Sequence, residues 1–122
     1  MKTKIEIIKE TVEYYSADVS RRSIFVTELG LYKCMYNSPD GKQCAFARCA
    51  EPIDSKYESY SSDKLLLEAG IKILKPEYRH IVNKSFWHAL QRLHDKHSHW
   101  GDRGLTEAGK TYVKKLMDKY KD

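Results

Sequence analysis

The sequence contains few prolines and glycines, which interrupt helices and strands, and few cysteines, which could form disulfides. Three prolines and six glycines among 122 residues exclude a Pro- or Gly-rich disordered chain. No apolar run approaches the ~20 residues that a membrane-spanning helix needs. Three cysteines, an odd number, do not suit a closed disulfide framework and favour a reducing compartment. The first residues also lack the apolar core of a secretory signal, so we expect one globular domain over residues 1–122, located in the cytoplasm.

Signals of catalysis are also missing. The glycines are isolated from one another, so no Gly-rich loop is available to hold a phosphate. His94 and Asp95, with His80 and Asp118, match the ligand types of metal-dependent phosphohydrolases, but their spacing is too compact for such a site. Cysteines and histidines can be paired on paper as nucleophile and base, yet nothing local supports a particular pair. We therefore expect a protein that is not an enzyme.

Positive charge is concentrated in one block of the chain. Residues 72–103 hold seven Lys and Arg against three Asp and Glu, and they contain all five histidines. Residues 1–71 instead hold ten basic against eleven acidic side chains. Clustered cations attract phosphates, although this excess also fits an ordinary solvated surface. The block 72–103 is the expected place for an anionic partner.

The first half of the chain predicts a helix followed by extended segments. Residues 3–15 show a capping-box spacing and apolar side chains at steps of three and four, which indicates an amphipathic helix. Residues 23–27 are β-branched and aromatic, and residues 31–36 are a second extended candidate. Residues 37–41, with Pro, Asp and Gly, predict a turn and a hairpin. Counting back from this turn places Cys34 opposite Cys44.

The second half predicts helices. Ser62 is a candidate cap of a short helix that stops at Gly70, and residues 76–82 suit another that begins with Pro. Ser85 is the candidate cap of the strongest helix, and Thr106 begins the last one. The stripes of the strongest helix are Phe86, Leu90, Leu93 and His97, and beside them Trp87, Gln91, His94 and Ser98. The expected fold class is α+β: an N-terminal helix, a small antiparallel hairpin sheet and C-terminal helices.

Short motifs are spread over residues 20–110. They are Cys34 to Tyr36 (CMY), residues 40–46 (DGKQCAF), residues 74–78 (LKPEY), residues 90–95 (LQRLHD), Trp100 and residues 104–106 (GLT). With these motifs the chain resembles small uncharacterised proteins encoded by bacteriophages and prophages. The resemblance implies the context of a phage accessory gene acting in the host cytoplasm, and it carries no activity.

The candidate binding surface combines cations with aromatic rings. Such a mixture can anchor a protein interface, and it can also neutralise phosphates while stacking bases. We predict that the surface joins the turn at Asp40 to the basic helix. Its residues are Arg79, Lys84, Trp87, Arg92, His94, Lys96, Trp100, Arg103 and Asp40. The expected function is that of a phage accessory binding protein that inhibits or sequesters a host defence component, with a host protein favoured as partner.

Other functions remain open from the sequence. A nucleic-acid-binding protein would use the same basic block, and a DNA-binding repressor would need a wing for which residues 101–104 leave little room. Two thiolates and two imidazoles, from Cys34, Cys44, His94 and His97, would make a tetrahedral zinc site, but buried free cysteines are the commoner outcome. A protein that takes up a nucleotide-sized ligand would need a pocket, which no sequence can display.

Overall fold

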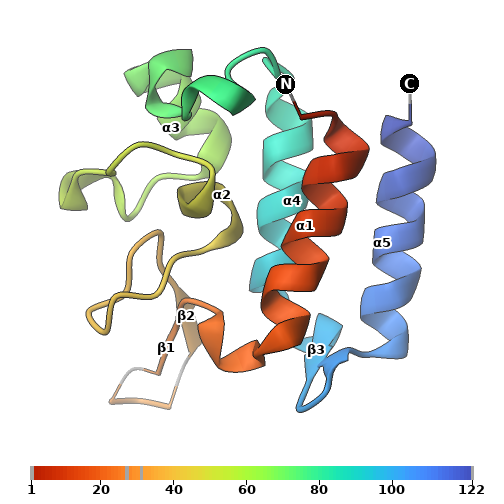
Figure 1. The fold of residues 1–122 in the computed structure, drawn as a ribbon. Helices are drawn as coiled ribbons and strands as arrows, with labels where there is room; N and C mark the ends of the chain where they lie inside the picture. The colour runs from red at the N-terminus through yellow and green to blue at the C-terminus, as the bar shows by residue number, and fades with distance from the viewer. Residues whose placement is uncertain (1, 27, 31, 122) are drawn as a thin grey trace.

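The computed structural model describes residues 2–26, 28–30 and 32–121 and has the predicted α+β class (Figure 1). The helices are α1 (Lys4–Ala17), α2 (Ala45–Arg48), α3 (Ser62–Ala69), α4 (Lys84–Asp95) and α5 (Glu107–Tyr120). The strands are β1 (Ile24–Val26), β2 (Tyr32–Cys34), β3 (Trp100–Gly101) and β4 (Gly104–Leu105). Short 3-10 turns cover Val19–Arg21, Ser55–Tyr57, Ile71–Ile73, Pro76–Tyr78 and His97–His99.

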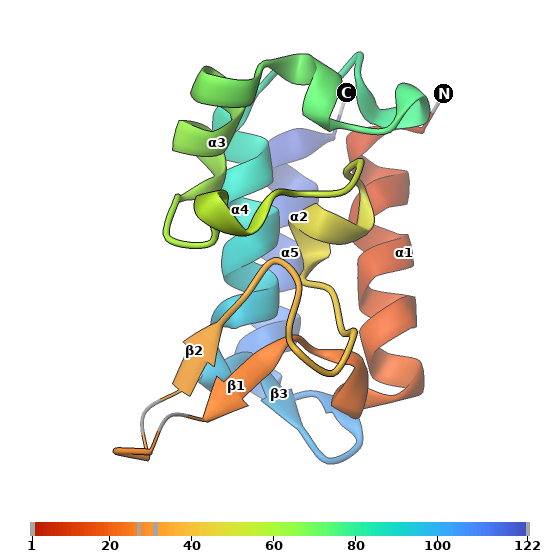
Figure 2. The same cartoon turned by 90° about the vertical axis from the view of Figure 1, so that its left-hand side faces the viewer.

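Three long helices form the body of the molecule. Helix α5 packs against both α1 and α4, while α2 and α3 cover another side of α4 (Figures 1 and 2). Each long helix buries an apolar face in one common core, because removing such side chains from water is the main favourable term in folding. The start of α1 and the end of α5 lie at one end of the body, and the hairpin of β1 and β2 lies at the other. No helix in the described ranges is long and apolar enough to cross a membrane.

The helix starts follow from capping side chains. Thr3 forms the predicted capping box with Glu6, and Thr106 caps α5 through the amide of Gly109. Helix α4 is capped by Asn83, two residues before the predicted Ser85, and α3 is capped by Ser61, with Ser62 as its first residue. Side-chain oxygens at these positions accept from amides that have no acceptor within the helix.

A two-stranded antiparallel hairpin is present, but it joins β1 and β2 and not the two segments beside the turn at residues 37–41. Strand β1 pairs with β2, so Cys34 lies opposite Ile24 and not opposite Cys44. The predicted turn does form, but it is closed by a single bridge between Asn37 and Gln43. Cys44 instead caps α2, because the following Ala-Phe-Ala segment packs against α4 as a helix. The outer ends of the two predicted strands, Thr27 and Leu31, lie outside the described residues.

Two further boundaries differ from the predictions. The segment that begins with Pro76 forms only the 3-10 turn Pro76–Tyr78, and not a helix to residue 82. Helix α4 ends at Asp95, so the predicted stripes do not continue to His97 and Ser98. The chain then turns through β3 and β4 into α5, with Gly104 at φ +113°, a conformation that favours glycine.

Candidate functional site

A surface cavity of about 440 Å³ lies along one side of α4. Its volume falls within the range of small-molecule pockets, roughly 300–1,000 Å³. One wall is made by His88, Gln91, Arg92 and Asp95 of α4 and by Lys96, which caps the end of this helix. These positions recur every three or four residues, so they share one face of the helix. The opposite face carries the buried Trp87, Leu90 and Leu93, which fix the helix and thereby the direction of the polar face.

The other walls come from the start of α3 and the end of the hairpin. Glu58, Tyr60, Ser61 and Ser62 precede or begin α3, and Cys34 and Tyr36 follow from β2. The Tyr36 hydroxyl donates a hydrogen bond to the Tyr60 carbonyl at 2.5 Å, which joins these two walls. Elements that are far apart in the sequence therefore meet at this pocket, which is why sequence patterns alone did not reveal it.

The two carboxylates of the pocket are already hydrogen-bonded. Glu58 accepts from the backbone amides of Tyr36 and Asn37 at 2.8 and 3.1 Å. Asp95 accepts from Gln91 Nε2 at 3.0 Å and from His94 Nδ1 at 2.7 Å. All of these donors are neutral, so both carboxylates have hydrogen-bond partners and keep their negative charge in the pocket.

The two cations of the pocket, unlike its carboxylates, have no hydrogen-bond or ion-pair partner among the described residues. Arg92, in the last turn of α4, and Lys96, the residue that follows this helix, are exposed and lie four residues apart. Within the part of the chain that the structure describes, neither side chain forms an ion pair or a hydrogen bond. The pocket therefore offers two cations without a direct partner beside the carboxylates Glu58 and Asp95, and both cations belong to the predicted set.

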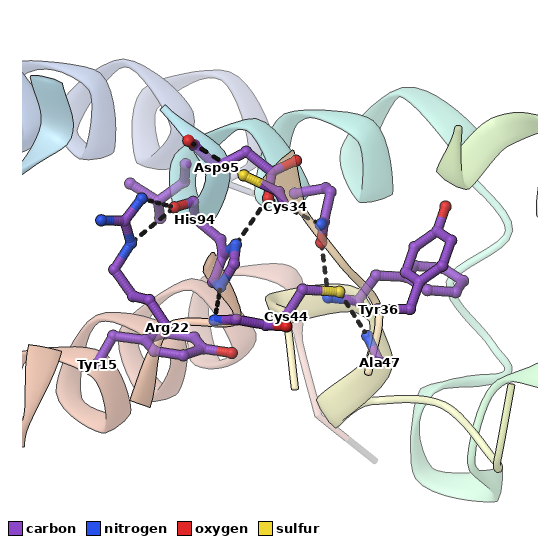
Figure 3. A network of polar contacts seen from close by, with 12 residues as sticks. Tyr15, Arg22, Cys34, Tyr36, Cys44, Ala47, His94 and Asp95 are labelled. Atoms are coloured by element: carbon purple, nitrogen blue, oxygen red, sulfur yellow. Dashed lines mark hydrogen bonds and ion pairs between the residues drawn. The ribbon is translucent and has the colours of Figure 1, made fainter. Parts of the chain in front are cut away.

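A buried polar network lies behind the pocket (Figure 3). His94 is 0% exposed, and its Nε2 accepts a hydrogen bond from the Ser23 amide at 3.1 Å. The proton of this neutral ring must then be on Nδ1, which donates to Asp95. Burial lowers the pKa of His94 and keeps it in this form. Arg22 donates twice to the His94 carbonyl, at 3.0 and 2.7 Å, so the network ties the segment before β1 to the end of α4.

This network leaves His94 without a free ring nitrogen for the zinc site that the sequence suggests. Both ring nitrogens of His94 are engaged, so His94 has no lone pair to offer a metal. Cys44 Sγ accepts from the Ala47 amide at 3.4 Å as the cap of α2, and Cys34 lies in β2. Among the described residues, His97 included, no group of three or more His, Cys, Asp or Glu is arranged to hold a metal ion.

The cysteines also have high proton affinities. Burial and the charge of Asp95 raise the pKa of the Cys34 thiol to about 12, and burial raises that of Cys49 to about 11. Burial raises the pKa of Cys44 as well. The Cys34 thiol donates a hydrogen bond to the backbone carbonyl of Asp95, with Sγ 3.5 Å from the oxygen. These thiols are held in the protonated form, which is the less nucleophilic one.

Three predicted site residues are buried. Trp87 is 0% exposed and donates from Nε1 to the Ile81 carbonyl at 2.9 Å. Trp100 is buried and donates to the Leu93 carbonyl at 2.8 Å, and His94 is enclosed as described above. A ring that is part of the core cannot stack on a partner, so the prediction that these residues contact a ligand at the surface is wrong.

The remaining predicted residues lie outside the pocket. Arg79 donates from Nε to the Leu74 carbonyl at 2.7 Å, and Lys84 borders a different hollow. Arg103 is exposed between β3 and β4. Asp40 is exposed, pairs with Lys42 at 3.3 Å, and has a pKa lowered by the Ser38 hydroxyl. The structure thus brings together only Arg92 and Lys96 of the predicted set.

The turn nevertheless lies near the end of α4. Lys42, two residues after Asp40, lines a second cavity of about 270 Å³ together with Arg22, Asp95 and His97. Asp95 borders both cavities. Lys42 of the turn segment lines one of them, and Arg92 and Lys96 line the other. Lys42 of the turn segment thus lies near the end of α4, but Asp40 and most of the predicted rings and cations line neither cavity.

Comparisons with known proteins found no similar protein. No family model, no curated protein and no solved structure matches this chain. The resemblance to phage-encoded proteins therefore stays a prediction, and the site has to be interpreted from its own geometry.

Proposed function

We propose that this protein is a non-catalytic binding protein that sequesters a small anionic ligand in the pocket between α3 and α4. One observation carries the proposal: the cations Arg92 and Lys96 are unpaired, while the carboxylates Glu58 and Asp95 are hydrogen-bonded within the protein. An anion that binds there gains two charge-assisted contacts, which are the stronger class of hydrogen bond.

This proposal replaces the host protein that the sequence favours as partner with a small molecule. The phage resemblance and the missing catalytic signals favour a host protein as partner, but Trp87 and Trp100, two of the expected anchors of such an interface, are in the core. A concave pocket of about 440 Å³ suits a small molecule. In the phage context that the resemblance implies, sequestering would remove such a molecule from a host defence component.

A titration followed by NMR of the backbone amides tests the proposal. With inorganic phosphate or citrate as the probe, we expect saturable shifts confined to residues 61–63 and 92–96. Arg92→Gln with Lys96→Gln should abolish them, while the matched control Arg103→Gln, which removes an exposed cation elsewhere, should leave them unchanged. The proposal fails if the wild-type protein shows no saturable shifts, or if the control loses them equally.

Salt dependence separates this function from nucleic-acid binding. A protein that contacts six to ten phosphates of a polymer loses about 10³- to 10⁵-fold in affinity between 50 and 200 mM salt. A small anion held by two cations should lose far less, because few counterions are released. A labelled single-stranded DNA of twenty nucleotides is the probe. Tight binding with a steep salt dependence that survives the double substitution would favour nucleic acid.

A further inference from the structure

The hairpin of β1 and β2 is joined to the body of the molecule through its base, which we define as residues 22–23 and 34–35. Its two strands pack mainly on each other, and the hairpin extends from one end of the body (Figures 1 and 2). The amide of Met35 donates a hydrogen bond to the Ser23 carbonyl at 3.2 Å, so the two sides of the base are held together. The contacts of the base therefore determine how the whole hairpin is attached.

Three polar contacts join the base to the end of α4 (Figure 3). Arg22 donates to the backbone carbonyl of His94, and the Cys34 thiol donates to that of Asp95. The amide of Ser23 donates to Nε2 of the His94 ring at 3.1 Å. A backbone carbonyl accepts hydrogen bonds at any pH, whereas an imidazole nitrogen accepts only while it has no proton. Of these three contacts, the one between Ser23 and His94 therefore depends on pH.

Protonation of His94 removes this contact. Nδ1 already donates to Asp95, so a second proton has to be on Nε2, where it faces the N–H group of Ser23. Both residues are 0% exposed, so water does not reach the new N–H group while the base is in place. A buried charged donor without an acceptor is costly. Leu90 and Leu93 hold α4 in the core, so the hairpin base is the part that is free to move away.

The ionisable groups that face the His94 ring do not give the same response. The carboxylate of Asp95 favours the charged ring, but burial outweighs it and lowers the pKa of His94. The Tyr15 ring of α1 lies edge to face at 5.0 Å, and burial raises its pKa. Burial also raises the pKa of Cys34 to about 12, and an arginine such as Arg22 stays charged near neutral pH. Tyr15, Cys34 and Arg22 thus keep their protons between pH 5.5 and 7.5.

We propose that proton uptake by His94 detaches the base of the hairpin from α4 while the three long helices stay folded. This inference goes beyond the proposed function and does not depend on it. Cys34 lines the larger cavity and Arg22 the smaller one, so detachment changes a wall of each. An exposed His94 ring has its ordinary pKa of about 6.5. If one proton is taken up on opening, the equilibrium constant for opening rises about tenfold between pH 7.5 and 5.5.

Hydrogen exchange followed by NMR tests the inference on the wild-type protein. The amides of Ser23 and Met35 report on the base, and those of Leu90 and Leu116 report on the helical body. After correction for intrinsic exchange rates, protection at the base should be lower than in the body and should fall about tenfold from pH 7.5 to 5.5. Equal protection of base and body at both pH values would overturn the inference, because only global unfolding would then expose His94.

Protection at the base that does not change with pH would also overturn the inference. That result is expected if the protonated ring stays in place and donates to the Ser23 hydroxyl, which is buried and has no partner among the described residues.

Two substitutions assign the response to one histidine. His94→Gln still accepts from the Ser23 amide and does not titrate, so protection at the base should change less than about twofold between the two pH values. The matched control is His97→Gln, because His97 is exposed and lines the smaller cavity beside Asp95. It should keep the tenfold change. A tenfold change that persists in His94→Gln, or that is lost in His97→Gln, would overturn the inference. The wild-type protein and His97→Gln suffice as a test if His94→Gln does not fold.

Discussion

Asp95 accepts a hydrogen bond from Nδ1 of its neighbour His94 at 2.7 Å, so one carboxylate belongs both to the buried network and to the pocket. The network fixes the end of α4, from which Arg92 and Lys96 reach the cavity. The stability of the fold and the geometry of the proposed site are therefore linked through this pair of residues.

The buried histidine makes stability depend on pH. Burial lowers the pKa of folded His94 below its ordinary value of 6.5, so the unfolded chain binds more protons than the folded one. Stability should be full above pH 6.5 and should be lost as the pH falls below it. Protonated Nε2 would also face the Ser23 amide, donor against donor. Urea denaturation at pH 7.5 and 5.5 measures this loss.

The matched variant for this prediction is His94→Gln, which can still accept from Ser23 but does not titrate. Its loss of stability between the two pH values should be smaller than in the wild-type protein. Part of the loss should remain, because burial also lowers the pKa of His99. Equal pH dependence in both proteins would show that His94 does not titrate with folding.

The second prediction concerns the contribution of the buried face of α4 to the stability of the fold. Leu93 is 0% exposed, so Leu93→Ala removes buried methyl groups and leaves a cavity. We expect a loss of about 2–5 kcal/mol in the free energy of unfolding, measured by chemical denaturation. Leu67→Ala, on the exposed side of α3 with 69% of the side chain accessible, should change it by less than about 0.5 kcal/mol. A small loss at Leu93 would mean that α4 packs differently.

Alanine substitutions at two glycines should have opposite outcomes: Gly109→Ala should destabilise the fold, and Gly101→Ala should be tolerated. A Cβ at Gly109 would lie 2.2 Å from the His99 carbonyl oxygen, so Gly109→Ala must displace backbone where α5 crosses the preceding turn. Overpacking of this kind costs about 1–3 kcal/mol or more. A Cβ at Gly101 meets its nearest atom, Thr106 Cγ2, at 3.5 Å, an ordinary contact. Thermal unfolding should separate the two variants, and equal midpoints would contradict this packing.

Local signals in the sequence predicted much of the fold. The capping box of Thr3 and the cap of Thr106 depend on residues three positions apart, so short-range chemistry determines them. The register of Cys34 could not be predicted in this way. Cys44 follows a good turn, and only the packing of α2 against α4 makes it a helix cap and leaves β2 to pair with β1.

Of the residues that line the pocket, the predicted binding surface includes only the two cations Arg92 and Lys96. Arg92 and Lys96 are conspicuous as charges on an amphipathic helix, whereas Ser61 and Ser62 lie in a segment that reads as a loop. The serine signal predicts the start of α3 to within one residue, at Ser62 in place of Ser61, but it does not show that this helix faces α4. Whether Trp87 faces solvent or the core depends on which side of α4 is covered, and the sequence does not state this.

The most direct test of the proposed site is charge reversal at its two cations. Calorimetric titration with citrate should detect binding to the wild-type protein and to Arg103→Glu, and no binding to Arg92→Glu with Lys96→Glu. The thermal midpoint should stay within a few degrees, because both side chains are exposed. Undiminished binding by the double variant would contradict the assignment of the pocket between α3 and α4 as the anion site.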